Sequence, residues 1–514
     1  MRLNNKASNA GFRNFNSGKT KESLAYLSKR LPHYSRVSFI VCQLLLWSTT
    51  NGLPESIREE ANERIYQDWG GVFGKRSARE SITDDLIGII GDAYDVRSGG
   101  QVSVISEEFC TFPENAKRCK GFNPDSSYVT FGLERIPGEA VFSPYSNRFR
   151  EDEAVIIFGK TPPLAKYFGH TEYLNTVDDG KRRRNGRLDI QASLHDAINP
   201  SNINVTSDGS YSDSFNKDYV IISSADQNMY GILSNALQQI GISSDIFNSR
   251  AWPKETVNLG IFYPSDTITI NMRIAFFEDQ AIGEQYLSDI PLTALRITPK
   301  LAKEEILPYP IPIRASKYNG ENEKKYETAL NKLEREIRKS IGGDKRAASK
   351  SIPIDLDPEE CLIENTQCFF DSPDSAYYGN VPGRFFKRGS FFIVIGTNHV
   401  KTGLARYANV AIYEAEKLLA VASFNSVNDM DNSTEQFLPN HEHADKLFAI
   451  TLRKKCKKKP FCVEVKFSRK NRGLPPFLLL ASRAYMHPNG TKSAYVDDLL
   501  PMRVIYGEKI IRNT

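Results

Sequence analysis

The chain has 514 residues, of which 40% are hydrophobic and 25% are charged, and its formal net charge is +5. This length predicts two or more domains, and the composition is that of a globular protein rather than a disordered or fibrous one. The small positive excess gives no reason to expect a nucleic-acid partner, because nucleic-acid-binding proteins concentrate Lys and Arg on one face.

The first 52 residues have the organisation of a targeting segment. A basic stretch over 1–36 precedes an apolar run over 37–47, and small polar residues follow it. This order is typical of a secretory signal peptide, and the run is shorter than the about 20 residues that span a bilayer. We therefore expect export. The basic leader is unusually long, so either translation begins at a later codon or residues 1–36 are an organelle-targeting segment before a second signal. The alternative to export is a buried N-terminal strand or helix after a disordered tail.

The next segments predict helices and then a first sheet-containing half. Amphipathic helices are expected over 54–67 and 80–93, with a polar, irregular loop over 96–126. Apolar or alternating runs predict strands over 127–135, 153–159, 217–223, 267–277 and 292–297. The clearest helix covers 225–240, with Ser224 at the N-cap, Gln227 completing a capping box and Gly241 ending the helix.

A connector over 301–387 is expected between two halves. It begins with a proline-stiffened strap over 306–313, continues with an amphipathic helix over 322–341 and ends in an irregular loop over 371–388. The second half then predicts strands over 389–396, 405–413, 448–452, 462–467, 477–486 and 502–506.

Two blocks of sequence recur in the same order and predict an internal duplication. In the first block, an apolar strand ending in Gly precedes Ala-(Lys/Arg)-Tyr-x5-Tyr, which begins at Ala165 and again at Ala405. The second block places Arg273, and later Arg483, on an apolar strand. We therefore expect an α/β or α+β fold with similar halves at 127–300 and 388–514, after an N-terminal helical segment at 53–126. The alternative is two generic amphipathic strand pairs.

Six of the seven cysteines form close pairs, namely Cys110 with Cys119, Cys361 with Cys368, and Cys456 with Cys462. None of these spacings is that of a structural zinc site, so three local disulfides in an oxidising compartment are the simplest interpretation. Unrelated buried thiols are the alternative. Sequons at Asn204, Asn432 and Asn489 permit glycosylation. We expect the protein to be secreted or to lie in the lumen of an oxidising compartment.

Familiar catalytic signatures do not occur in the sequence, so the candidate site comes from positions that the repeat makes equivalent. The candidate ligand-binding residues are Tyr167, His170, Arg273, His399, Tyr407 and Arg483. If the halves face each other, two Arg side chains and an aromatic wall converge on a pocket for a small anionic or aromatic molecule. The alternative is that each Arg pairs within its own half, for instance with Asp289 and Asp498.

Two further features suggest alternative functions. His441 and His443 project to one face of an extended segment, where His399 or a carboxylate could complete a divalent-metal site for a hydrolase or oxidoreductase. Basic runs at 181–184 and 453–459 suggest a polyanionic glycan or a membrane surface as partner, with solvated loops as the alternative. The leading hypothesis is an exported protein that binds a small molecule between its halves. The sequence leaves catalysis and oligomeric state open.

Overall fold

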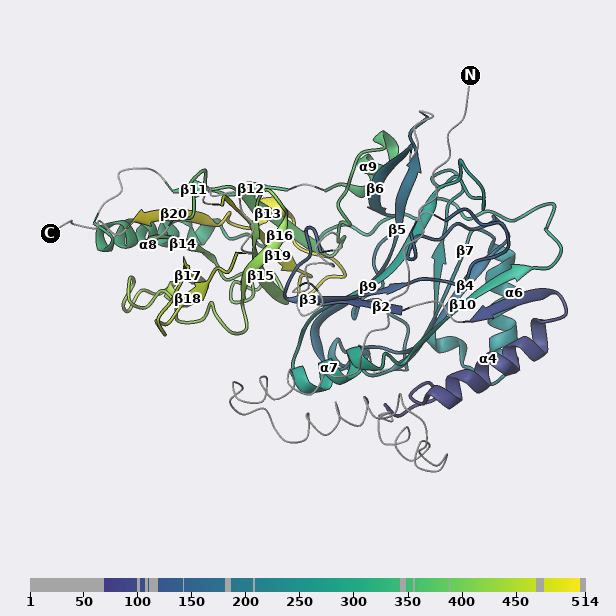
Figure 1. Ribbon diagram of the computed structural model, residues 1–514. Helices are drawn as coiled ribbons and strands as arrows, with labels where there is room; N and C mark the ends of the chain where they lie inside the picture. The colour runs from purple at the N-terminus through teal and green to yellow at the C-terminus, as the bar shows by residue number, and fades with distance from the viewer. Residues whose placement is uncertain are drawn as a thin grey trace, which may run out of the picture. The chain divides into compact units, whose positions relative to one another are not determined.

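Twenty strands and five α-helices make up the described part of the chain, which comprises residues 69–98, 102–106, 110, 119–141, 143–180, 186–206, 209–342, 348–354, 356–387, 389–467 and 476–508. The helices are α4 (Arg76–Ile90), α6 (Gln227–Gln239), α7 (Gln280–Ser288), α8 (Glu327–Ser340) and α9 (Pro358–Glu364). This is a computed structural model (Figure 1). The predicted segment 1–52 and the predicted helix 54–67 lie outside the described residues.

The strands divide equally between the two halves. Those of the first half are β1 (Tyr94–Ser98), β2 (Val102–Ile105), β3 (Ser126–Phe131), β4 (Ala154–Lys160), β5 (Ala165–Asp178), β6 (Arg187–Ser193), β7 (Asp218–Ser224), β8 (Phe247–Ala251), β9 (Thr267–Phe277) and β10 (Leu292–Pro299). Those of the second half are β11 (Ser349–Lys350), β12 (Ile352–Pro353), β13 (Ser375–Asn380), β14 (Ser390–Thr397), β15 (Tyr407–Glu414), β16 (Leu419–Asn425), β17 (Leu447–Arg453), β18 (Cys462–Glu464), β19 (Leu478–Tyr485) and β20 (Arg503–Glu508).

The two halves repeat the same sheet topology. The first half has an outer sheet of order β1-β10-β4-β7-β8 and an inner sheet of order β2-β3-β9-β5-β6. The second half has an outer sheet β11-β20-β14-β17-β18 and an inner sheet β12-β13-β19-β15-β16, so every strand has an equivalent in the same place. The predicted mixed fold with two similar halves is therefore confirmed as α+β.

Finer details of pairing also repeat. Only the last pair of each outer sheet, β7 with β8 and β17 with β18, is parallel among the described strand pairs. The pairs β5–β6 and β15–β16 both carry an irregularity in register near the same end of the strand. A repeat that reaches the register of individual strands makes residue-by-residue comparison of the halves possible.

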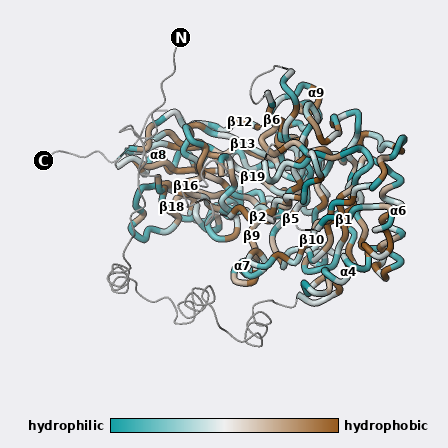
Figure 2. The backbone as a smooth tube through the Cα atoms, turned by 45° about the vertical axis from the view of Figure 1, so that its right-hand side comes forward, coloured by the Kyte–Doolittle hydropathy of each residue, from teal (hydrophilic) through white to brown (hydrophobic). Residues whose placement is uncertain are grey.

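Burial on both faces explains the central strands of the outer sheets. β4 and β14 are continuous apolar runs, and every residue in each strand is buried. In the first half, α4 and α6 cover one face of the outer sheet, and the inner sheet packs against the other (Figure 1). In the second half, α8 covers the outer sheet in the same way. The apolar residues, brown in Figure 2, follow these strands.

The helix predicted over 225–240 forms over Gln227–Gln239, with a different cap from the one expected. Asp226, not Ser224, accepts the hydrogen bond from the backbone N–H of Asn228. The hydroxyl of Ser224 instead donates to the carbonyl of Glu153, which directly precedes the neighbouring strand β4. Gly241 follows the helix with φ of +86°, a conformation that favours glycine at a helix C-terminus.

Strands also form in segments that the sequence suggested to be irregular. β2 and most of β1 lie in the predicted loop 96–126, and β13 lies in the predicted loop 371–388. Ser- and Gly-rich composition hid these strands, which are held by pairing with β3, β10 and β19 rather than by propensity. No helix in the described part of the chain is long and apolar enough to cross a bilayer.

All three predicted disulfides are formed. Cys110 is bonded to Cys119, Cys361 to Cys368, and Cys456 to Cys462, with Cα–Cα distances of 5.8, 6.0 and 5.7 Å. Three structural disulfides are typical of a protein in an oxidising environment.

Candidate functional site

Two short segments cross from each half to the other. Residues 119–125 lead into β3, and residues 368–374 lead into the equivalent strand β13. The carboxylate of Asp125 accepts a hydrogen bond from the phenol of Tyr407 at 3.1 Å, and that of Asp374 accepts one from Tyr167 at 2.9 Å. We call these segments the crossing loops, and the contact between the two inner sheets the junction.

The contacts of the crossing loops are reciprocal. Tyr173 of the first half donates to the carbonyl of Asp371 at 3.0 Å, and the equivalent Tyr413 of the second half donates to the carbonyl of Gly121 at 3.3 Å. Each half therefore donates a tyrosine hydrogen bond to the crossing loop of the other half. This is the pattern of a self-complementary interface between two copies of one fold.

Strand register brings one arginine from each half to the junction. On β9, Arg273 lies opposite Tyr128 on one side and Gly169 on the other. On β19, Arg483 lies opposite Tyr377 and Asn409, which are the equivalent positions. Because side chains alternate along a strand, each Arg shares a sheet face with its Tyr neighbour. The two Arg side chains are thus equivalent in the repeat.

Both guanidinium groups are buried among phenols. Arg273 and Arg483 are 8% and 9% exposed. Arg273 Nη2 donates to the carbonyl of Phe370 in the crossing loop at 3.1 Å, and its Cζ lies 5.1 Å from the ring centre of Tyr128. Arg483 Nη2 donates to the phenol of Tyr413 at 2.9 Å.

No carboxylate pairs with either guanidinium group in the part of the chain that the structure describes. The alternative of ion pairs with Asp289 and Asp498 is not observed: Asp289 instead lies near Arg79, and Asp498 lies near Tyr378. Arg273 Nε and Arg483 Nη1 are buried without an acceptor. A guanidinium group presents five N–H donors, and leaving such groups buried and unpaired is costly.

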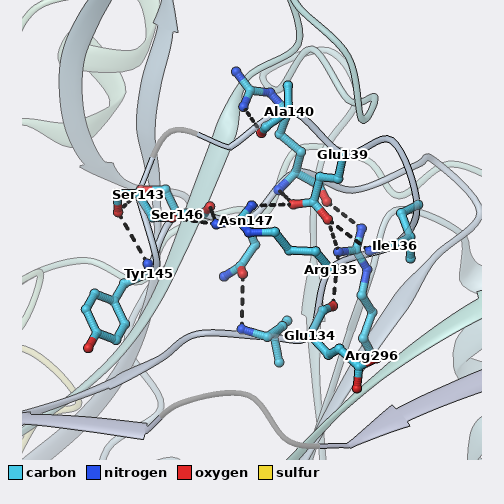
Figure 3. A network of polar contacts seen from close by, with 12 residues as sticks. Glu134, Arg135, Ile136, Glu139, Ala140, Ser143, Tyr145, Ser146, Asn147 and Arg296 are labelled. Carbon is cyan, nitrogen blue, oxygen red and sulfur yellow. Dashed lines mark hydrogen bonds and ion pairs between the residues drawn. The ribbon is translucent and has the colours of Figure 1, made fainter.

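Arg296 shows how this fold treats a buried guanidinium group that is structural. Its Nη1 lies 2.5 Å from Glu139 and its Nη2 lies 2.8 Å from Glu153, and all three side chains are fully buried. Figure 3 shows Glu139 bridging Arg296 and Arg135. Two carboxylates thus neutralise Arg296, whereas Arg273 and Arg483 have none.

The tyrosines around the two arginines do not provide the negative charge that would balance the guanidinium groups. Burial raises the pKa of Tyr128 to about 12, although the charge of Arg273 lowers it in part. Burial likewise raises the pKa values of Tyr173, Tyr377 and Tyr413 above their ordinary value. These phenols are therefore neutral at neutral pH. The carboxylates of the junction, Asp125, Asp371 and Asp374, accept hydrogen bonds from other groups, and none of them forms an ion pair with Arg273 or Arg483.

Asp371 is the carboxyl group whose pKa responds to Arg273, but it makes no ion pair with it. The carboxylate of Asp371 accepts hydrogen bonds from the backbone N–H and hydroxyl of Ser193 at 2.8 and 2.7 Å. Burial raises the pKa of Asp371 to about 6, against the lowering effects of Ser193 and of nearby positive charges. Its hydrogen bonds hold it at the edge of the first half.

An aromatic wall borders the two arginines. The ring of Tyr485 lies 5.0 Å from that of Tyr167 and 5.8 Å from that of Tyr407. Tyr485 is equivalent to Ala275, so the large residue of one half and the small residue of the other share one apolar cluster. The rings present flat apolar faces next to the buried charges.

Four of the six sequence-predicted ligand residues lie at the junction, and two do not. Tyr167, Arg273, Tyr407 and Arg483 contribute to it. His170 lies three residues after Tyr167 and therefore on the opposite face of β5, where its Nε2 is 2.9 Å from the Tyr219 phenol.

His399 contacts the connector rather than the junction. Its Nδ1 lies 2.8 Å from the carboxylate of Glu323, a buried residue just before α8. The carboxylate also accepts hydrogen bonds from the hydroxyls of Thr397 and Thr402 at 2.5 and 2.6 Å. His399 thus fastens the connector to the second half, away from the junction that the sequence predicted for it.

The histidines proposed as metal ligands form no metal site among the described residues. The rings of His441 and His443 are 6.1 Å apart, and His441 Nδ1 accepts the backbone N–H of His443. No group of three His, Cys, Asp or Glu side chains in the described ranges is arranged to hold a metal ion.

A surface cavity of about 450 Å³ lies in the first half, at the start of the strap. Its cations are already neutralised, because Arg150 pairs with Asp152 and Lys254 pairs with Glu151. The unpaired charges of the junction make the junction the stronger candidate site.

The sequence contains a further repeat, at the crossing loops, that the pattern of apolar strands did not reveal. Pro-Asp-Ser-Ser-Tyr ends at Tyr128, and Pro-Asp-Ser-Ala-Tyr ends at Tyr377. In both copies a disulfide-bonded cysteine, Cys119 or Cys368, lies six residues before the aspartate. A search for short polar repeats, rather than apolar strands alone, would have found both Asp residues and both Tyr residues.

No protein-family model matches the chain, and no curated protein does. Among solved structures, the crystal structure of an uncharacterized protein from Burkholderia cenocepacia matches with a TM-score of 0.37 and 10% sequence identity. The match covers 88% of this chain and 94% of that protein. A similarity of this size carries no inference about function.

Proposed function

We propose that this protein binds a small anion with a flat or apolar body between its two halves. The two buried guanidinium groups of Arg273 and Arg483, which no described carboxylate neutralises, carry this proposal. A buried charge without a partner costs several kcal/mol, and a bound anion offsets that cost. Guanidinium groups suit carboxylates, and the neighbouring Tyr faces suit a flat body.

Ligand-induced stabilisation of the full-length protein tests the proposal. We expect the melting temperature to rise with the concentration of an aromatic carboxylate, benzoate or terephthalate, at constant ionic strength, because a ligand that binds only the folded state stabilises it. Arg273→Gln and Arg483→Gln should each abolish most of this rise. If neither carboxylate raises the melting temperature of the wild-type protein, the proposal is wrong.

Arg503→Gln is the matched control. Arg503 is also buried, but it contacts Asn331 at 2.7 Å and the carboxylate of Glu334 at 3.0 Å, in the second half and away from the junction. This variant should lose stability without losing the response to carboxylates.

Stability without ligand separates a binding arginine from a structural one. Replacing an unpaired buried charge by a neutral residue of similar volume is neutral or stabilising. Arg273→Met and Arg273→Gln should therefore unfold within about 1 kcal/mol of the wild-type protein in the absence of anions. A loss of several kcal/mol in both variants would show that Arg273 holds the junction together and would overturn the proposal.

A second candidate function is the binding of a polyanionic glycan by a basic turn in the second half. The turn is held by the disulfide between Cys456 and Cys462. Five lysines on it are exposed, and none has an ion-pair partner among the described residues: Lys454, Lys455, Lys457, Lys458 and Lys459. A fixed group of like charges attracts a polyanion and is screened by salt.

Retention on immobilised heparin tests this second function. We expect the triple variant Lys457→Gln, Lys458→Gln and Lys459→Gln to elute at lower salt than the wild-type protein. The control variant carries three equal charge changes, Lys324→Gln and Lys325→Gln in the turn before α8 and Lys332→Gln on α8, and should elute with the wild-type protein. Equal elution of the two triple variants would contradict this function.

We also propose that the protein is exported and glycosylated. The disulfides support an oxidising compartment, and Asn204, Asn432 and Asn489 are all exposed residues, with Asn204 Nδ2 donating to the carbonyl of Phe247 at 2.8 Å. Protein purified from the culture medium of its native host should lose mass on treatment with an N-glycosidase. An unchanged mass, or protein found only with free thiols inside the cell, would contradict this proposal.

A further inference from the structure

We infer that the ligand is a dianion with two-fold symmetry, specifically a small dicarboxylate whose carboxylates are joined by a flat body. This inference rests on the proposed function, and it specifies the class of ligand for the same site. It follows from the equivalence of the two cationic positions rather than from either arginine alone.

The junction contains two subsites that share an arginine and a tyrosine at equivalent positions. In the first subsite, Arg273 lies beside Tyr128 and donates to the crossing loop of the other half at Phe370. In the second, Arg483 lies beside Tyr377 and donates to Tyr413, whose phenol contacts the crossing loop of the first half. A ligand that uses both subsites meets the same donor type twice, so a ligand with two equivalent ends fits both.

The two guanidinium groups match two negative charges. Each contributes one positive charge and has a buried nitrogen without an acceptor, Nε of Arg273 and Nη1 of Arg483. The carboxylates nearby, Asp125, Asp371 and Asp374, are held by other hydrogen bonds and form no ion pair with either group. The surrounding phenols are neutral at neutral pH because burial raises their pKa values. A monoanion neutralises only one of the two buried charges, whereas a dianion neutralises both.

The strand faces that carry the two guanidinium groups meet. Tyr167 shares the face of Arg273, Tyr485 shares the face of Arg483, and the two rings lie 5.0 Å apart. The charges of both Arg273 and Arg483 lower the pKa of Tyr128, and both also lower the pKa of Tyr377, in each case against the larger raising effect of burial. One phenol from each half is therefore within the electrostatic reach of both arginines. This proximity favours one small ligand that bridges the two subsites over two separate ligands.

The residues that differ between the halves leave the charges equal. Gly169 and Ala275 in the first half correspond to Asn409 and Tyr485 in the second. The amide of Asn409 is engaged with the crossing loop, and the ring of Tyr485 packs on Tyr167. These differences change the apolar wall but add no charge, so both ends of the ligand still meet a guanidinium group.

Two pairs of ligands that differ only by one carboxylate test the inference. Isothermal titration of the full-length protein should show that terephthalate binds at least tenfold more tightly than benzoate, and fumarate more tightly than crotonate. Arg273→Gln and Arg483→Gln should each reduce terephthalate binding to the level of benzoate. Arg503→Gln should keep the full preference for the dianion.

The outcomes separate this inference from the proposed function. Equal affinities for terephthalate and benzoate, both lost in the arginine variants, would leave the anion site in place and overturn the dianion. A preference for terephthalate that survives either arginine variant would also overturn it, because one subsite would then suffice. No binding of any of the four ligands would overturn both proposals.

Discussion

Asp125 and Asp374 occupy equivalent places in the two crossing loops, but their surroundings differ. Both carboxylate oxygens of Asp125 accept hydrogen bonds, from Tyr407 and from Ser423 among others. In Asp374 only Oδ2 accepts, from Tyr167 and Asn199, and Oδ1 is buried without a donor. Burial raises the pKa of Asp374 to about 7, against the lowering effect of its two hydrogen bonds.

This environment predicts that Asp374 destabilises the protein above neutral pH. The pKa is 3.8 in the unfolded chain and about 7 in the fold. Neutral Asp374 therefore makes its full contribution to the free energy of unfolding below pH 3.8, and this contribution is lost as the pH rises through 7. Asp374→Asn should remove this loss and gain roughly 2–4 kcal/mol over the wild-type protein at pH 8.

Urea unfolding between pH 5 and pH 8 measures the effect. The control is Asp125→Asn, which removes a carboxylate with donors on both oxygens and should lower stability across the range. The prediction is contradicted if the difference in unfolding free energy between Asp374→Asn and the wild-type protein is the same at pH 5 and at pH 8. The buried carboxylate of Asp374 would then not determine how stability depends on pH.

The core of the first half carries polar residues where the second half is apolar. Strand register makes four pairs equivalent: His170 with Val410, Glu172 with Ile412, Tyr219 with Phe448, and Ser223 with Leu452. Glu172 accepts hydrogen bonds from Ser223, Trp252 and His195. The second half forms the same fold with apolar residues at these positions. Because His170 and Glu172 can change charge and their equivalents cannot, we expect the stability of the first half to depend more on pH.

His170→Val, which introduces the residue found in the second half, should reduce the acid sensitivity of the protein. Burial, helped by the charge of Arg250, lowers the pKa of His170 from 6.5 to about 3. As the pH falls, His170 is therefore protonated in the unfolded chain before it is protonated in the fold. The contribution of neutral His170 to the free energy of unfolding is full above pH 6.5 and falls by roughly 2–4 kcal/mol as the pH drops toward 3.

Chemical denaturation at pH 7 and pH 4 checks this prediction. At pH 7 the variant should lose about 1–3 kcal/mol, because the phenol of Tyr219 loses its partner. At pH 4 that deficit should shrink or reverse. The partly exposed His441→Gln serves as the control and should follow the wild-type profile. A deficit that grows toward pH 4 would contradict the prediction.

At the scale of elements, the first two disulfides belong to the crossing loops. Cys119 and Cys368 each begin a crossing loop, and each is bonded to a cysteine that precedes the loop. The carbonyl of Phe370, two residues after Cys368, accepts the hydrogen bond of Arg273. These bonds therefore fix the chain at the point where one half begins to contact the other.

Removing the Cys361–Cys368 bond should affect both stability and the junction. The double variant Cys361→Ser and Cys368→Ser should lose about 2–4 kcal/mol, because its unfolded chain is no longer constrained. Carboxylate binding should also weaken, since the loop that orients Arg273 becomes freer. Removing the Cys456–Cys462 bond should lower stability but leave carboxylate binding unchanged. Similar binding losses in both double variants would contradict the link to the crossing loop.

At the scale of the whole molecule, the junction joins two copies of one fold through reciprocal contacts. Tyr407 and Asp125 come from different halves, and their side chains are hydrogen-bonded at 3.1 Å. A double-mutant cycle with Tyr407→Phe and Asp125→Asn should therefore give a coupling energy of about 1–2 kcal/mol. Equilibrium unfolding measures it. A coupling near zero would mean that the halves do not stabilise each other through this contact.

Apolar runs were sufficient to predict the halves. A strand buried on both faces needs apolar residues at consecutive positions, as in Val155–Phe158. The repeat also predicted Arg273 and Arg483 as an equivalent pair. The placement of His170 was wrong, since an offset of three residues from Tyr167 reverses the face of a strand. His399 was misplaced because its partner, Glu323, comes from the connector.

The sequence by itself determined the duplication, the three disulfides and the two arginines on apolar strands, because strand pattern and residue spacing are local properties. Only the tertiary structure decided which charges are neutralised. Arg296 meets two carboxylates, while Arg273 and Arg483 meet neutral phenols and a crossing loop from the other half. Those partners lie 70 to 157 residues away in the chain, so strand register and the contact between the halves bring them together.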